Sequence, residues 1–318
     1  MKLADAQINY FLAKVLKLPP GKRKDFLAQV DFLIDRLQKK IRDNGSFKVK
    51  GFKKTGSLIK GTVLKPKGDD GVDADVAVYL DVSESDRKNI DALHQIIKKL
   101  ACAVYPQKSD RDFEVQPRTL GIHFRDSGLD VDLVPIVPIP SEEGYGWQPS
   151  SQKADPVKTS VDGQLKFIKR RADADPAYRN LVRLVKKWRN EQELDFFRSF
   201  LIELVLAHLQ DTQGNAPDLE TGLQRFFLYV AQSGLQEPIA FPENGKISTF
   251  PKGSVVVLDP VNKDNNVAMR LSDAERREIV ATAEAAWEKI NTASFNGGKG
   301  ETLELWKEVF GRSFAIEE

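Results

Sequence analysis

The chain has 318 residues, of which 41% are hydrophobic, so it is long enough to bury a substantial core in one large domain or two. Its 48 basic and 46 acidic residues leave a net charge of +2, which excludes a strongly polycationic surface for nucleic acid. The single cysteine, Cys102, excludes an intramolecular disulfide, fits a reducing cytoplasm, and with only three histidines is too little for a structural Cys/His zinc site.

The first half of the chain is predicted to mix helices and strands. Apolar residues at helical spacing indicate helices over 4–17, 20–43 and 89–105. Apolar runs bounded by turn residues indicate strands at 47–52, 72–80, 113–117, 119–124 and 129–134. No signal peptide or stretch long enough to span a bilayer is evident, so we expect a cytoplasmic protein without a membrane segment.

Two features near the strand 72–80 carry most of the chemical information. Gly56 and Ser57 open a short helix, and the N–H groups at a helix N-terminus favour phosphate. Asp73 and Asp75 lie two positions apart at the start of the strand, so both side chains project from one face. Two carboxylates at such a short distance repel each other unless a cation lies between them. Oxygen ligands favour Mg2+. A metal ion beside a polyphosphate indicates nucleotidyl transfer.

A third acidic residue is expected from the strand 129–134. Asp130 and Asp132 share one face of that strand, and an antiparallel neighbour would bring one of them beside Asp73 and Asp75. Three carboxylates are the cluster that a two-metal mechanism needs. For an Asp-x-Asp pair taken alone, solvated acids at the edge of a loop are the alternative interpretation.

Two further acids, Asp69 and Asp70, precede Asp73. They lie in Lys65–Gly71, a turn-rich segment in which acids normally cap the backbone or face water. Asp73 and Asp75, by contrast, lead into an apolar strand that fixes their direction. We therefore exclude Asp69 and Asp70 as metal ligands.

The second half is predicted to be helical. Residues 136–160 are rich in Pro, Gly and Ser and are predicted to be a long loop, in which Tyr145 and Trp147 either stack on a base or pack as a lid. These two aromatic residues are not assigned to the site. The helices that follow are expected at 161–173, 176–192, 196–212, 219–234, 273–293 and 301–310.

Polar residues in two of these later segments are candidates for nucleotide binding. Arg183 shares a neighbouring helical face with Lys186 and Lys187, and a group of cations matches the charge of a triphosphate. A solvated basic face is equally consistent with this pattern. Asp259 follows an apolar run and belongs either to the site or to turn and cap chemistry.

Taken together, these segments resemble the bacterial CD-NTases, the cyclic-oligonucleotide synthases of CBASS anti-phage defence. This family is related to cyclic GMP–AMP synthase and 2′-5′-oligoadenylate synthetase in the polymerase-β nucleotidyltransferase superfamily. The similarity spans nearly the whole chain and is closest to clade C. It is carried by Gly56–Thr62, Asp73–Tyr79, Ser127–Pro135, Leu181–Trp188, Ser199–Leu204, Leu258–Asn262 and Trp306–Gly311.

The resemblance implies an α+β fold with two domains. Residues 1–160 would form a polymerase-β-like nucleotidyltransferase core with the N-terminal helices and a mixed, mostly antiparallel sheet. Residues 161–318 would form a helical, oligoadenylate-synthetase-like nucleotide-binding domain. One departure is the connection between Ser57 and Asp73, which at fifteen residues (58–72) is longer than is usual in the superfamily.

The resemblance also assigns roles to individual residues. The catalytic residues and metal ligands are Asp73, Asp75 and Asp132, binding two Mg2+ ions or Mn2+ as a substitute. Asp132 is favoured over Asp130 because the ligand in relatives directly precedes a Leu-Val-Pro type of sequence. The nucleotide-binding residues are Gly56, Ser57, Arg183, Lys186, Ser199 and Asp259.

The implied activity is synthesis of a cyclic oligonucleotide from NTPs in anti-phage signalling, with ATP the main substrate and cyclic triadenylate the expected product. The implied partners are a HORMA-domain activator and a nucleotide-activated effector nuclease. One alternative is a nucleotidyltransferase that modifies a separate acceptor such as an antibiotic, a protein or an RNA end. A second is a non-catalytic nucleotide or RNA sensor, which has no need for a metal cluster.

Overall fold

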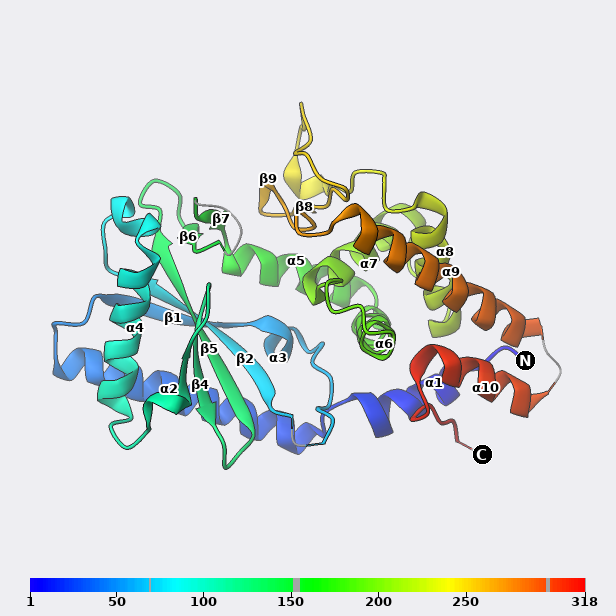
Figure 1. The fold of residues 1–318 in the computed structure, drawn as a ribbon, viewed down its shortest axis with the longest axis horizontal. Coiled ribbons are helices and arrows are strands. Elements are labelled where there is room, and N and C mark those ends of the chain that lie inside the picture. The colour runs from blue at the N-terminus through cyan, green and yellow to red at the C-terminus, as the bar shows by residue number, and fades with distance from the viewer. Residues whose placement is uncertain (69, 151–154, 296–297, 318) are drawn as a thin grey trace. The chain divides into compact units, whose positions relative to one another are not determined.

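The structure is a computed structural model that describes residues 1–68, 70–150, 155–295 and 298–317. The chain forms two compact units (Figure 1). The sheet unit is Leu18–Leu165, and the helical unit combines Met1–Lys17 with Lys166–Glu318. Asp69 and part of the predicted loop 136–160 lie outside the described residues.

The sheet unit alternates helices and strands along the chain. Its helices are α2 (Pro20–Asp43), α3 (Gly56–Lys60) and α4 (Ile90–Val104), with short 3-10 turns at Glu84–Lys88 and Asp110–Asp112. Its strands are β1 (Val49–Thr55), β2 (Val72–Leu80), β3 (Phe113–Val115), β4 (Leu120–Phe124), β5 (Leu129–Pro138), β6 (Gly146–Gln148) and β7 (Val157–Thr159).

The strands form one sheet in the order β1-β2-β5-β4-β3, and β6 and β7 extend it from β5. β2 and β5 pair in parallel, whereas the neighbouring pairs are antiparallel. The predicted mixed, mostly antiparallel sheet is therefore confirmed. The antiparallel pairing expected between the Asp73 strand and the strand that carries Asp130 and Asp132 is wrong, because these two strands pair in parallel. Between β2 and β5 the chain passes through α4 and the β3–β4 hairpin, which is the long connection that a parallel pair requires.

One face of this sheet is buried against α2 and α4 (Figure 1). Its apolar residues come from alternate positions of the two central strands: Val72, Ala74, Val76 and Val78 in β2, with Leu129, Val131 and Leu133 in β5. The helices contribute the residues predicted from helical spacing, including Phe26, Val30, Leu33 and Leu37 of α2. Since strand side chains alternate, the intervening aspartates project from the other face.

The described residues of the segment 136–160 contain three strand pieces where a long loop was predicted. β5 continues to Pro138, and β6 and β7 pair with it in turn. Gly146 permits this close pairing, because a Cβ there would lie 2.4 Å from Cγ2 of Ile136. Trp147 packs against the core and donates its Nε1–H to Glu84 at 2.8 Å, in agreement with the packing alternative for this residue.

The helical unit is built mostly from the second half of the chain. Its helices are α1 (Asp5–Phe11), a π-helical turn at Leu12–Leu16, α5 (Val161–Ala174), α6 (Tyr178–Glu191), α7 (Ser199–Gln213), α8 (Leu219–Ser233), α9 (Asp273–Phe295) and α10 (Lys299–Phe310). The boundary between the two units falls within α5, whose residues from Lys166 onward belong to the helical unit. A 3-10 turn at Pro242–Asn244 and the short strands β8 (Leu258–Asp259) and β9 (Asn262–Asn266) lie between α8 and α9.

The first 17 residues differ from the predicted division of the chain. They were expected in the catalytic core with residues 1–160, but they pack with the helical unit. The Leu3 N–H donates to the buried carboxylate of Glu220 at 2.6 Å, and the Phe11 ring lies 4.7 Å from that of Phe314. These contacts connect α1 to α8 and to the C-terminal segment, although they are distant in sequence.

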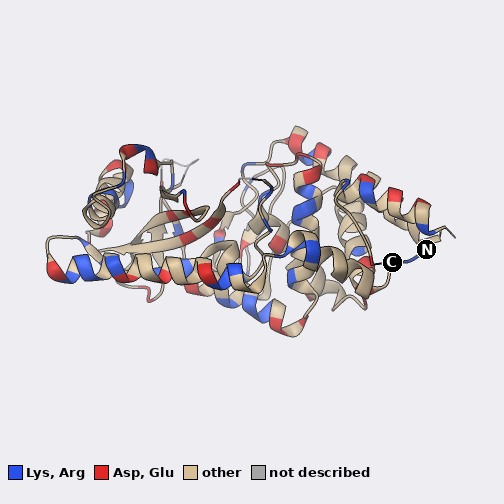
Figure 2. Cartoon of the chain, turned by 90° about the horizontal axis from the view of Figure 1, so that it is seen from below, with Lys and Arg blue, Asp and Glu red and all other residues tan. Residues whose placement is uncertain are grey.

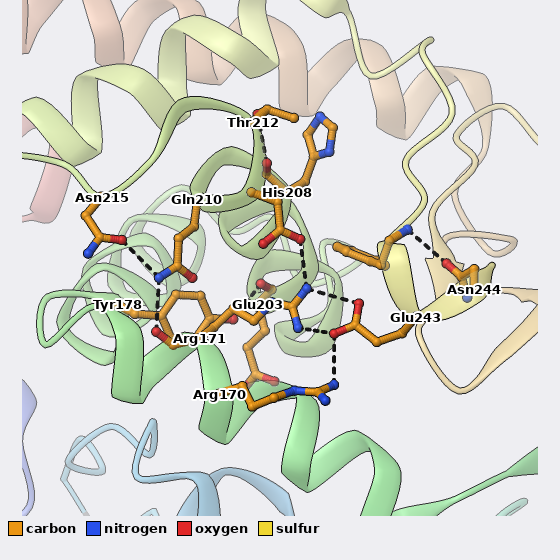
Figure 3. A network of polar contacts seen from close by, with 12 residues as sticks. Arg170, Arg171, Tyr178, Glu203, His208, Gln210, Thr212, Asn215, Glu243 and Asn244 are labelled. Atoms are coloured by element: carbon orange, nitrogen blue, oxygen red, sulfur yellow. Dashed lines mark hydrogen bonds and ion pairs between the residues drawn. The ribbon is translucent and has the colours of Figure 1, made fainter.

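Arg171 on α5 is the centre of a charged network in the helical unit (Figure 3). Its side chain is only 8% exposed, and Nη2 lies 2.8 Å from Asp211 Oδ2 and 3.1 Å from Glu243 Oε2. The guanidinium also lies 3.7 Å from the centre of the Phe167 ring. The network therefore connects α5, α7 and the turn at Pro242–Asn244.

Replacing Arg171 with alanine is expected to lower the free energy of unfolding by about 3 kcal/mol, because it removes the buried cation that the partly buried Asp211 and Glu243 share. Arg170 is the matched control, since it bonds the same Glu243 at 2.8 Å but is 61% exposed. Arg170→Ala should cost less than about 1 kcal/mol. Urea denaturation of both variants tests this difference, and equal losses would contradict the central role of Arg171.

Charges of both signs are spread over the surface. Basic and acidic residues are interspersed along α2 in Figure 2, and neighbours such as Lys39 and Asp43 pair at 2.9 Å. This mixture agrees with the small net charge of the chain. In the described part of the chain, every helix is too short or too polar to span a bilayer.

Candidate active site

Four aspartates come together where β2 pairs with β5. Asp73 lies opposite Asp130, and Asp75 lies opposite Asp132. Paired strands are about 4.8 Å apart, and residues in parallel register project from the same face. The three residues predicted to be catalytic therefore lie on two adjacent strands, on the face opposite the core of α2 and α4.

The environment of Asp132 shows how close these charges are. Burial raises the pKa of Asp132 above its ordinary value, and the negative charge of Asp73 raises this pKa further. The Thr119 hydroxyl, 3.3 Å from Asp132 Oδ1, opposes this shift by donating a hydrogen bond. Asp73 and Asp132 are thus near enough to repel each other.

This raised pKa predicts a pH dependence of stability in a chelated, metal-free buffer. Because the folded pKa exceeds the unfolded one, ionising Asp132 opposes folding, and its stabilising contribution is lost as the pH rises through the folded pKa. Asp132→Asn removes this effect, so the variant should be at least as stable as the wild type at neutral pH. Urea denaturation from acidic to neutral pH measures the difference. A less stable variant at neutral pH would contradict the assignment.

The turn formed by Gly56 and Ser57 lies beside Asp75. Thr55 at the end of β1 pairs with Asp75, and Gly56 follows with a positive φ of +74°. A Cβ on Gly56 would lie only 1.7 Å from Asp75 Oδ2, so the start of α3 packs directly onto that carboxylate. Ser57 is the next residue of α3 and is half-buried. The structure therefore brings the predicted phosphate-binding turn beside the predicted metal ligands.

Asp130 has a partner that the sequence interpretation missed. His123 of β4 lies opposite it, and the two side chains meet at 2.7 Å between Nδ1 and Oδ1. The signal for this pair was present in the sequence. The turn at residues 125–128 sets the hairpin register, which places Phe124 opposite Leu129 and His123 opposite Asp130.

The donor set at this face is made of carboxylate oxygens, which suit a hard divalent cation such as Mg2+ or Mn2+. Within the described ranges, no three His, Cys, Asp or Glu side chains form a group already arranged to hold a metal ion. The register nevertheless places Asp73, Asp75 and Asp132 on one face of two adjacent strands. The residues present fit such an ion in number and in chemistry.

The other predicted nucleotide-binding residues belong to the helical unit. Arg183 on α6 donates to Asn180 Oδ1 at 3.2 Å, and Lys186 on the same helix is buried. Burial, followed by the charge of Arg183, lowers the pKa of Lys17, so a further cation lies near Arg183. Lys187 is instead engaged within its own helix, where it pairs with Glu191 at 2.6 Å.

Ser199 and Asp259 lie in different surroundings. Ser199 is the first residue of α7 and is half-buried. Asp259 at the end of β8 is buried, and its carboxylate accepts the N–H of Val261 at 3.1 Å and the side-chain amide of Asn265 at 3.4 Å. These contacts of Asp259 are local to its turn, as the alternative of turn chemistry predicts.

Comparisons with known proteins identify the family. No protein-family model matches the chain. Over 318 residues it is 42% identical to a CBASS oligonucleotide cyclase CdnC from Escherichia coli strain KTE188, with 100% of this chain and 99% of that protein covered. The chain therefore belongs to the CD-NTase family of CBASS. This CD-NTase is also 33% identical over 315 residues to a cyclic AMP-AMP-AMP synthase from Escherichia coli strain MS 115-1, covering 96% of each.

Solved structures agree with this assignment. The CD-NTase matches the CdnC of E. coli MS115-1 in its complex with HORMA-deltaN, with a TM-score of 0.85, 32% identity and 98% of each chain covered. It also matches the Vibrio cholerae DncV cyclic AMP-GMP synthase with a TM-score of 0.73 and 12% identity, covering 99% of this chain and 97% of that one. The second likeness shows the fold alone.

The family confirms the predicted α+β fold and the predicted enzyme class. This CD-NTase is a nucleotidyltransferase that produces a cyclic oligonucleotide. Family membership favours this activity over transfer to a separate acceptor and over a non-catalytic sensor.

Proposed function

We propose that this CD-NTase is a Mg2+-dependent synthase that converts ATP into cyclic triadenylate. The observation that carries this proposal is the parallel pairing of β2 with β5, which sets Asp73, Asp75 and Asp132 side by side next to Gly56. The product and substrate are supported by relatives. One relative is a cyclic AMP-AMP-AMP synthase, and the E. coli MS115-1 CdnC, at a TM-score of 0.85, has been solved with ATP.

In this proposal each residue of the sheet unit has one role. Asp73, Asp75 and Asp132 hold the divalent cations, and the backbone at Gly56 and Ser57 binds the β- and γ-phosphates of the donor. Bound Mg2+ supplies Lewis-acid polarisation of the α-phosphate and lowers the pKa of the acceptor hydroxyl. A ribose hydroxyl of the acceptor then attacks the α-phosphate, and pyrophosphate leaves. The protein contributes mainly positioning and electrostatic stabilisation.

The helical unit would supply further contacts to the nucleotide. Lys186, Ser199 and Arg183 are proposed to contact the triphosphate, since cations match its charge and the family resemblance assigns these positions. Asp259 is proposed to lie near a nucleobase or ribose, on the resemblance alone. Transfer is repeated and then closed into a ring within the same enzyme.

Regulation by a partner is part of the proposal. The CdnC of E. coli MS115-1 has been solved in complex with HORMA-deltaN. By analogy, a HORMA-domain protein activates this CD-NTase, and its cyclic product activates an effector nuclease.

The test is mass spectrometry of the product formed from an equimolar mixture of the four NTPs with Mg2+, with and without a HORMA-domain protein. We expect a phosphatase-resistant cyclic triadenylate that requires Mg2+ and increases with the partner. The double variant Asp73→Asn with Asp75→Asn is the negative control. A different cyclic product would overturn the proposed base selection, and product formation in the presence of chelator would overturn the metal dependence.

A further inference from the structure

Asp130 lies beside the three predicted ligands, but the proposed mechanism gives it no role. Asp130 is on β5, where it lies opposite Asp73 of β2 and opposite His123 of β4. One carboxylate oxygen, Oδ1, is 2.7 Å from His123 Nδ1, and because an ionised carboxylate only accepts, His123 donates this hydrogen bond. The other nitrogen of the ring, Nε2, lies 3.5 Å from Glu114 on β3. The imidazole is therefore held between two carboxylates.

The second oxygen of Asp130 lies against the chain that enters β2. A Cβ added to Gly71 would come within 2.3 Å of Asp130 Oδ2 and 3.3 Å of the Gly128 carbonyl oxygen. The next residue, Val72, donates its N–H to that same Gly128 carbonyl at 2.8 Å. The two residues directly before Asp73 are thus packed on Asp130 and bonded to the turn that precedes it.

These contacts of Gly71 and Val72 can fix the start of β2. The connection between Ser57 and Asp73 has fifteen residues, and a long connection leaves the first residues of a strand free to vary unless contacts fix them. A carboxylate held by a histidine N–H is also less available as a ligand. Partners behind the ligands of a metal site commonly set ligand direction in this way.

We propose that the His123–Asp130 pair is a positioning device. It fixes the Gly71–Val72 segment so that Asp73 faces Asp132, and it keeps Asp130 out of the metal site. His123 and Asp130 are positioning residues in this view, not ligands. The inference rests on the proposed metal-dependent function of Asp73, Asp75 and Asp132.

Conservative and disruptive substitutions separate this role from ligation. Asp130→Asn keeps an oxygen that accepts from His123, whereas Asp130→Ala removes it. His123→Asn keeps an N–H donor close to the place of Nδ1, whereas His123→Leu removes it. Asp126→Asn is the matched control, because Asp126 is exposed in the same β4–β5 turn.

The first measurement is the affinity of the full chain for Mn2+ alone, from the free Mn2+ signal in electron paramagnetic resonance. Asp130→Ala and His123→Leu should weaken Mn2+ binding about tenfold, the loss typical of removing a partner behind a metal ligand. Asp130→Asn, His123→Asn and Asp126→Asn should remain close to the wild type. If Asp130→Asn abolishes Mn2+ binding as Asp132→Asn does, Asp130 is a ligand and the proposal is wrong.

The second measurement needs no metal. Hydrogen exchange at the Val72 amide reports the bond to Gly128 directly, and it should accelerate in His123→Leu and Asp130→Ala but not in Asp126→Asn. Unchanged Val72 protection in both disruptive variants would overturn the positioning role. If the wild type binds no Mn2+, the proposed metal-dependent function fails, while Val72 exchange still decides whether the pair anchors the chain.

Discussion

Asparagine at both Asp73 and Asp75 is expected to reduce cyclic-oligonucleotide synthesis by at least about 1,000-fold, the factor that several kcal/mol of metal-supplied charge stabilisation corresponds to. Both residues start β2 on the face away from the core, with Asp75 packed against Gly56 and paired with Asp132. Neither is buried, so the substitutions remove charge and ligands without opening a cavity. The fold should therefore persist while the activity is lost.

Pyrophosphate release from ATP and Mg2+ measures the activity, and thermal unfolding verifies the fold. The matched control is Asp81→Asn, at the other end of β2, where Asp81 is exposed and pairs with Lys50 at 3.2 Å. This variant should retain activity close to the wild type. Activity of the double variant above a tenth of the wild type would show that the chemistry does not depend on these carboxylates.

Much of the sheet unit could be predicted because local spacing determines which side chains are buried. Phe26, Val30, Leu33 and Leu37 recur at helical spacing, and all four are buried in α2. The alternation in β2 likewise places Asp73 and Asp75 together, opposite the buried Val76 and its neighbours. Periodicity is a property of consecutive residues, so a single sequence contains it.

The direction of the β2–β5 pair could not be predicted with the same reasoning. Asp73 and Asp75 share a face whether the neighbouring strand is parallel or antiparallel. The signal that favours parallel pairing is weaker: the second half of each strand is apolar on both faces, and a helix lies between the two strands in the chain. Each of these features also occurs in antiparallel sheets.

The place of the N-terminal segment depends on contacts that are remote in sequence. Leu3 bonds Glu220, and Phe11 packs on Phe310 and Phe314, so residues near both ends of the chain determine the unit to which α1 belongs. No local pattern in residues 4–17 contains that information. The π-helical turn at Leu12–Leu16 was also missed, because its apolar spacing resembles that of an ordinary α-helix.

In the candidate site, some features follow from local sequence and others depend on how the strands pair. The three aspartates and Gly56 form a compact group, because the motif is short and the strands hold its residues in register. The choice between Asp130 and Asp132 rested on resemblance, and the structure adds a physical difference between them. Asp130 is bonded to the imidazole of His123, whereas Asp132 accepts a hydrogen bond from the Thr119 hydroxyl and lies opposite Gly121, which has no side chain.

Gly56→Ala is expected to reduce activity about 100-fold or more, because displacing a reacting group by about 1 Å carries a penalty of this size. The new methyl group would lie 1.7 Å from Asp75 Oδ2, so either the backbone at the start of α3 or the Asp75 side chain must move. Alanine is also strained at a φ of +74°, which adds about 1–2 kcal/mol of destabilisation. This variant therefore tests whether the start of α3 must touch Asp75 for catalysis.

Gly68→Ala separates the two contributions. Gly68 lies in the connection between Ser57 and Asp73 and, like Gly56, has a positive φ, +56°, but nothing lies within 4 Å of a Cβ there. It should show a comparable loss of stability in urea denaturation with little loss of pyrophosphate release, whereas Gly56→Ala loses both. Full activity of Gly56→Ala would mean that the contact is incidental, and the assignment of Gly56 and Ser57 to the phosphates would lose its structural support. Equal activity losses in the two variants would instead trace the effect to backbone strain at the substituted glycines.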